Sequence, residues 1–164
     1  MPNTELAVRP LTVIEIEVSS GLDDHVDSPY RGRTDPTIIL SSTVKPSKRQ
    51  IHYTHLGFPF AWERFVFERD GKYKWHCWLL PFMLVQAKIL PFHLVMDNLG
   101  DGQIGMYLKI ARNMPPYRMV VSQEGKRDLE IEEYVFESQR YCAAHVNELQ
   151  TVRIEEIAQE ASQA

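Results

Sequence analysis

The sequence has few cysteines and lacks the motifs that mark common enzyme classes. Its 164 residues include only two cysteines, Cys77 and Cys142, too few for a disulfide-stapled secreted scaffold, and neither belongs to a CxxC pair. There is no GxSxG, HExxH or Walker loop. The segment 100–105 matches GxGxxG only by spacing, because no clear strand precedes it and no helix pattern follows it. We therefore favour a non-enzymatic protein without a cofactor, and keep a small hydrolase as a third alternative.

Long hydrophobic runs and a secretion signal are also missing. The N-terminal residues 1–10 have no basic patch followed by an apolar stretch, which a signal peptide requires. The longest apolar region, 75–96, is broken by Gln86, Lys88, two prolines and two histidines, so it cannot span a bilayer without a large desolvation cost. We therefore expect a cytoplasmic protein with no membrane partner.

What the sequence does have is an uneven distribution of charge and aromatic residues. Residues 1–44 contain seven acidic and three basic residues, and residues 128–164 contain nine acidic and two basic residues. Between them, residues 45–127 contain 13 basic and six acidic residues, together with 13 of the 17 aromatic residues. A basic, aromatic middle therefore lies between two acidic flanks, and this asymmetry indicates a binding surface for a macromolecule.

Several segments show the patterns of strands and turns. Ile14, Ile16 and Val18 alternate with Glu15 and Glu17, which predicts a half-buried strand. Further strands are predicted over 37–40, 104–110 and 117–122, and an exposed loop over 19–36, with almost no apolar residues. The apolar stretch 82–90 fits either a short helix or a buried strand, and periodicity leaves this open.

The clearest predicted element is a hairpin over 62–79. Asp70-Gly71 suits the positive φ angles of a type I′ turn, which would pair Arg69 with Lys72. In that register one face carries the candidate binding residues Phe65, Phe67, Arg69, Lys72, Lys74, His76 and Trp78. The other face carries Trp62, Val66, Tyr73, Trp75, Cys77 and Leu79, and we assign it to the core.

Aromatic rings that stack on bases and cations that follow phosphates hold single-stranded nucleic acid, so the first face of this hairpin suits single-stranded RNA or DNA. The alternative is a sheet buried on both sides, with lysines at the hairpin tip for solubility. The acidic flanks also count against nucleic acid, because they can neutralise the patch or repel phosphate.

Histidines are the remaining candidates for a site. His52, His55, His76 and His93 could ligate a metal, but on a strand positions 52 and 55 point to opposite faces. No second closely spaced ligand pair completes a zinc signature. Glu63, Glu68, His76 and Asp97 could form an acid–base set, although nothing in their spacing singles them out. We therefore predict no metal site and no catalytic residues.

From about Glu132 the apolar residues follow a helical period, with Val135, Cys142, Val146 and Leu149 on one stripe. This predicts an amphipathic C-terminal helix over 130–160 with an acidic tail, although residues 129–131 also alternate like a strand. The expected fold class is α+β: one domain over 1–164, in which a twisted antiparallel sheet of about five to seven strands packs against this long helix. The helix could also mediate a homo-oligomer.

These patterns favour a binding or accessory protein that docks on a macromolecular complex as an inhibitor, adaptor or assembly factor, of phage or mobile-element origin. The partner would be a protein or an assembly. The main alternative is a single-stranded RNA- or DNA-binding protein that uses the hairpin face. Salt dependence distinguishes the two, because phosphate neutralisation releases counterions whereas docking through aromatic anchors does not.

Overall fold

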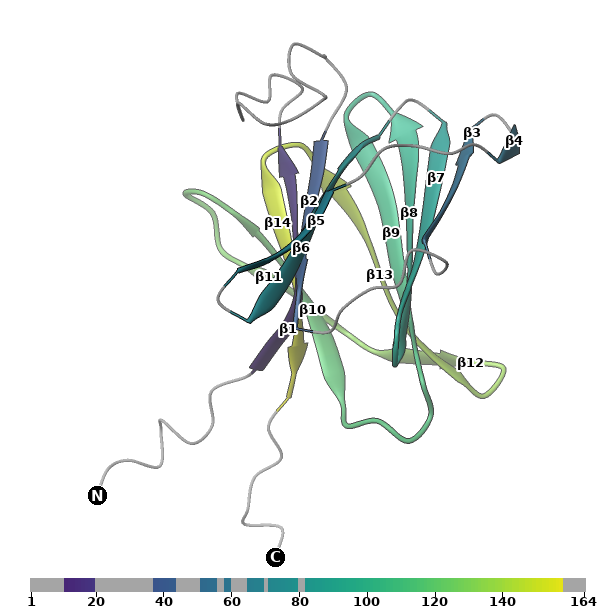
Figure 1. The fold of residues 1–164 in the computed structure, drawn as a ribbon. Coiled ribbons are helices and arrows are strands. Elements are labelled where there is room, and N and C mark those ends of the chain that lie inside the picture. Colours follow the sequence, from purple (N-terminus) through teal and green to yellow (C-terminus); the bar gives the residue numbers. More distant parts are fainter. Residues whose placement is uncertain are drawn as a thin grey trace, which may run out of the picture.

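The computed structural model describes residues 11–19, 37–43, 51–55, 58–59, 65–69, 71–79 and 82–157. Side chains are described at 11–19, 38–43, 54, 71–74, 79 and 82–157. These parts of the chain form fourteen strands, all paired antiparallel, and contain no helix. The strands lie in two sheets that face each other, as Figure 1 shows. The expected α+β class is therefore wrong, because the described chain is all-β.

Each sheet contains seven strands. The first, sheet A, has the spatial order β11 (Leu129–Glu132), β10 (Tyr117–Gln123), β14 (Gln150–Glu156), β1 (Leu11–Ser19), β2 (Thr37–Ser42), β6 (Lys72–Trp78) and β5 (Phe65–Arg69). The second, sheet B, has the order β12 (Tyr134–Phe136), β13 (Gln139–Asn147), β9 (Gln103–Ile110), β8 (Phe92–Gly100), β7 (Met83–Ile89), β3 (Ile51–His55) and β4 (Phe58–Pro59).

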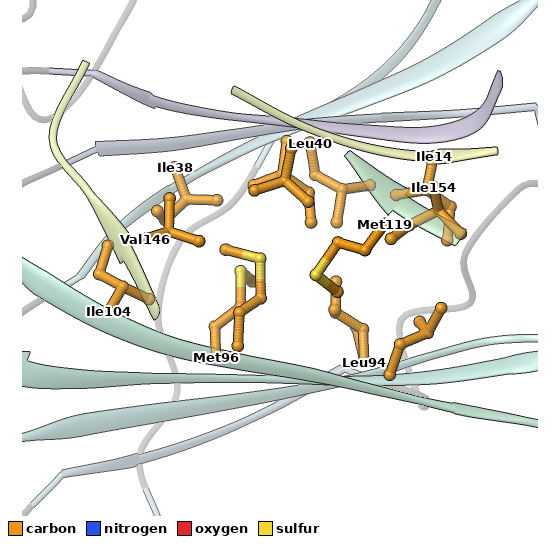
Figure 2. Close-up of a cluster of buried hydrophobic side chains, with 14 of the residues drawn as sticks. Ile14, Ile38, Leu40, Leu94, Met96, Ile104, Met119, Val146 and Ile154 are labelled. Atoms are coloured by element: carbon orange, nitrogen blue, oxygen red, sulfur yellow. The ribbon is translucent and has the colours of Figure 1, made fainter. Parts of the chain in front are cut away.

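The two sheets are held together by one apolar core. In strands such as β1, β7 and β9 alternate residues are buried, so each sheet contributes one apolar face to the layer between them. In Figure 2, Ile14, Leu40 and Met119 of sheet A face Leu94 and Met96 of sheet B. All five are buried, as are most of their inward-pointing neighbours in both sheets. Strand alternation therefore gives each sheet one face that packs against the other sheet and a second face that points away from the core.

The predicted C-terminal helix is wrong, because residues 129–156 form four strands. Cys142, Val146, Val152 and Ile154 are fully buried, and they alternate within β13 and β14 with the period of two that strands require. Val135, which shared the predicted helical stripe, is 67% exposed. The chain crosses from sheet B to sheet A between β13 and β14. The segment that was predicted as one long helix therefore contributes strands to both sheets.

Several other predictions are confirmed. Ile14, Ile16 and Val18 are buried in β1 while Glu17 is exposed, and strands occur over the ranges predicted around 37–40, 104–110 and 117–122. The open question at 82–90 is resolved as strand β7. The hairpin register is also confirmed, because Arg69 pairs with Lys72. The predicted loop lies outside the described residues, apart from Ser19 at the end of β1. No described segment is a helix long and apolar enough to cross a lipid bilayer.

Candidate binding face

The outward face of sheet A near β10 and β14 is occupied by ion pairs within the protein. Glu155 lies between two arginines: Arg118 Nε donates to its Oε1 at 3.3 Å and Arg153 Nε donates to its Oε2 at 3.0 Å. Arg153 also donates to Asp128 at 3.3 Å and to the Ser122 hydroxyl at 2.9 Å. The polar groups on this part of the sheet therefore satisfy one another.

A second polar cluster closes one end of the sandwich, where Glu133 connects β11 of sheet A to β12 of sheet B. Arg140 donates two hydrogen bonds to the Glu133 carboxylate, from Nε at 2.6 Å and from Nη2 at 2.7 Å. Arg140 also donates to the carbonyls of Met114 at 2.7 Å and Pro115 at 2.8 Å, and the Tyr117 N–H donates to Glu133 at 2.6 Å. A hollow of about 480 Å³ lies beside the clamp that Glu133 and Arg140 form. The charged groups of these two residues are already hydrogen-bonded to each other.

These contacts determine the ionisation of Glu133. Burial opposes the charged carboxylate, but the hydrogen bonds from Arg140 and from the Tyr117 N–H together outweigh it, so the pKa of Glu133 is lowered. We therefore assign this cluster a structural role, as a clamp between the two sheets.

The outward face of sheet B is different, because it is hollowed and less polar. A depression of about 570 Å³ lies over β7, β8, β9 and β13, within the range of small-ligand sites. The strand register explains its position: Asp97, Gly105 and His145 lie side by side on β8, β9 and β13, with the glycine in the middle. Because Gly105 has no side chain, the Leu99 side chain lies close to its Cα, at the edge of the depression.

Gly105 is not required by the backbone, since its φ lies outside the left-handed region in which L-residues are strained. A Cβ at this position would meet Leu99 Cδ1 at 3.4 Å and the Asp97 carbonyl oxygen at 3.9 Å. A glycine in the middle of a strand weakens it, and often marks a place where a ligand or another backbone approaches closely. Here the closest group is the Leu99 side chain, so the glycine makes room for Leu99 within the lining of the depression.

Three polar side chains line the depression without a partner of their own. They are Gln86 on β7, Asp97 on β8 and His145 on β13. In the part of the chain that the structure describes, none of the three has a hydrogen bond or an ion pair. Asp97 and His145 are two strands apart, roughly 10 Å at a spacing of about 4.8 Å per strand, too far for the direct contact of a catalytic acid–base pair. They are placed to contact a ligand from opposite sides.

A row of three tyrosines continues from the depression to β12. Tyr107 on β9 packs edge-on against Tyr141 on β13, with ring centroids 6.3 Å apart, and Tyr141 stacks with Tyr134 on β12 at 5.5 Å. Tyr107 is 44% exposed and Tyr134 is 48% exposed. The outward face of sheet B therefore presents aromatic surface beside the depression, and we call the two together the binding face.

The structure places the predicted hairpin site elsewhere, on β5 and β6 at the far end of sheet A. Phe65 pairs with His76 and Phe67 pairs with Lys74, as the sequence predicts. Lys72 is exposed and Lys74 is half-buried, whereas the side chains of Phe65, Phe67, Arg69, His76 and Trp78 lie outside the described residues. Whether those rings face solvent stays a prediction.

The histidine candidates are spread over both sheets. His52 and His55 lie on β3 and His93 on β8, all in sheet B, whereas His76 lies on β6 of sheet A. Among the residues with described positions, no three His, Cys, Asp or Glu side chains come together in a way that could hold a metal ion.

Sequence reasoning did not find the binding face. Gly105 and Tyr107 alternate with buried Ile104, Met106 and Leu108, so the outward positions of β9 could be identified from the pattern. What the pattern lacks is the pairing of β9 with β8 and β13, which brings residues from positions 84 to 145 onto one surface. No family model, no curated protein and no solved structure matches this chain.

Proposed function

We propose that this chain is a non-enzymatic binding protein that docks on a macromolecular partner through the binding face of sheet B. The observation that carries the proposal is the contrast between the two sheets: ion pairs engage the charged groups around Glu155 on sheet A, whereas Asp97, Gln86 and His145 have no partner in the described chain. Polar groups that converge on an apolar depression are the usual composition of a recognition site.

The proposal is tested by filling the depression. Gly105→Leu places a side chain in the space beside Leu99, and Ala143→Leu, on the next strand, does so from an exposed position with less risk to the fold. The matched control is Glu17→Leu, which adds a leucine at an exposed outward position of sheet A. Urea unfolding first establishes that each variant is folded.

The readout is the material that immobilised protein retains from an extract of the source organism. A partner that docks on the binding face is retained by the wild type and by Glu17→Leu, and is lost from Gly105→Leu and Ala143→Leu. If both filled variants retain the same material as the wild type, the face is not the recognition surface and the proposal is wrong.

Binding of single-stranded nucleic acid through the β5–β6 hairpin is the second candidate, supported by the register that places the candidate positions on one side of the ribbon. Fluorescence anisotropy with mixed-sequence RNA and DNA oligonucleotides at two salt concentrations tests it. Binding that falls steeply with salt and is lost in Lys72→Gln/Lys74→Gln, but not in Lys88→Gln/Lys109→Gln, supports this candidate. No binding at low salt removes it.

A further inference from the structure

The chemistry of the depression restricts what it can bind. The Asp97 carboxylate can only accept hydrogen bonds, the Gln86 amide both donates and accepts, and a neutral His145 ring offers one of each. These side chains make no hydrogen bond with protein groups in the described chain, so their hydrogen-bonding capacity is open to water or to a ligand in the depression. The site therefore suits a ligand with several groups that both donate and accept, which is the property of hydroxyl groups.

The floor of the depression is apolar. Val95, which is 6% exposed, lies between Gln86 and Tyr107 in the strand register, and Gly105 contributes only backbone. Leu99 rises at one side of Gly105, since its Cδ1 is the nearest side-chain atom to a Cβ placed there. A ligand that fits must combine polar edges with an apolar face.

Charge and burial restrict the ligand further. An anion would meet the Asp97 carboxylate in the depression, whereas Lys88 and Lys109 lie outside its lining residues and exclude no cation. A purely apolar ligand would cover Gln86 and Asp97 and leave them without hydrogen bonds, which is unfavourable for a buried polar group. A ligand that is rich in hydroxyl groups and apolar on one face meets these conditions.

A sugar ring has this composition, because its hydroxyl groups project at the rim while its C–H groups form an apolar face. We infer that the binding face recognises neutral sugar units, so that the partner is a glycan or carries one. This inference rests on the proposed function and names the chemistry of its partner. The tyrosine row extends the site from Tyr107 through Tyr141 to Tyr134, so it accommodates several sugar units in line.

Direct binding is measured first, with a panel of short neutral oligosaccharides of glucose, mannose, galactose and xylose on an array, followed by titration calorimetry of those retained. Tyr107→Ala removes an exposed ring and is expected to weaken binding about tenfold. Asp97→Asn keeps an acceptor oxygen, so a neutral ligand loses no more than about threefold, whereas a cationic ligand would lose far more. Binding changes little with salt if the ligand is uncharged.

A second experiment separates this inference from the proposed function. The material retained by the wild type is treated either with periodate, which cleaves the vicinal diols of sugars, or with protease. Retention that periodate abolishes and protease spares supports the glycan. Retention that protease abolishes and periodate spares overturns the glycan and leaves the docking function intact, provided that Gly105→Leu still abolishes it. Retention that neither Gly105→Leu nor Ala143→Leu reduces overturns both.

Discussion

Replacing Arg140 by methionine tests the clamp that joins the two sheets. Methionine keeps much of the apolar stem but removes the two bonds to Glu133 and the short bonds to the carbonyls of Met114 and Pro115. Glu133 would then remain a half-buried charge whose strongest partner is gone. Both side chains of the pair are only 16% exposed, so water replaces the lost partner poorly.

Removing one member of a buried ion pair costs about 3–5 kcal/mol. Because water reaches part of the Glu133–Arg140 pair, we expect Arg140→Met to lower the free energy of unfolding by about 3 kcal/mol, at the lower end of that range. The double variant Glu133→Gln/Arg140→Met should be more stable than Arg140→Met alone by about 1 kcal/mol, because it leaves no unpaired charge and keeps an oxygen for the Tyr117 N–H.

Urea unfolding followed by circular dichroism measures these differences, with Arg112→Met as the control. Arg112 is exposed on the neighbouring loop, and its replacement should change stability by no more than about 0.5 kcal/mol. The reasoning is refuted if Arg140→Met matches this control, or if the double variant is less stable than Arg140→Met.

The clamp also predicts a pH dependence. The pKa of Glu133 is lower in the folded protein than in the unfolded chain, where it is about 4.3. Its ionisation therefore stabilises the fold above about pH 4.3, and this contribution is lost as the pH falls through the folded-state pKa. The stability difference between the wild type and Glu133→Gln should accordingly shrink as the pH drops below about 4.

Three further changes test the fold. Burial, with smaller effects of nearby glutamates, raises the pKa of the Cys142 thiol to about 12, so in a Cys77→Ala background iodoacetamide should label Cys142 only as fast as the protein unfolds. Ser138→Gly should stabilise the β12–β13 hairpin by about 0.5–1 kcal/mol in urea unfolding, because Ser138 has a φ of 63°. Leu40→Ala should cost about 2–5 kcal/mol in the same assay, against less than about 0.5 for Leu129→Ala, which removes a 60% exposed side chain.

Strands with a strict period of two could be predicted from sequence alone. Ile14, Ile16 and Val18 alternate with acidic residues, and the Asp70-Gly71 turn sets the register of β5 and β6. Both signals are local, since each lies within about ten residues, and neither depends on which strands pair elsewhere. Such a local pattern predicts the strand correctly because the sandwich buries one face of a strand such as β1 and exposes the other.

The C-terminal strands were missed because their turns lack the usual residues. No glycine or proline occurs after Gly125. The turn of the β12–β13 hairpin places Glu137 and Ser138 at positive φ instead, and the connection from β13 to β14 does the same with Leu149. Without a glycine or proline to mark the turns, a glutamate-rich segment with apolar residues three and four apart is typical of a helix. The buried alternation of Cys142 and Val146, four residues apart, fits both periods, so spacing alone could not distinguish them.

The binding face was missed because only the pairing of β9 with β8 and β13 brings its residues together. Asp97 and Glu155 both point outward, from sheets B and A, but Glu155 lies between two arginines whereas Asp97 has no partner in the described chain. Glu155→Ala should therefore cost about 2 kcal/mol in urea unfolding, and Asp97→Ala no more than about 0.5. If the two cost the same, Asp97 has a structural role and is not available to a ligand. If they differ as expected, the fold does not depend on the Asp97 carboxylate, which is then free to contact a ligand.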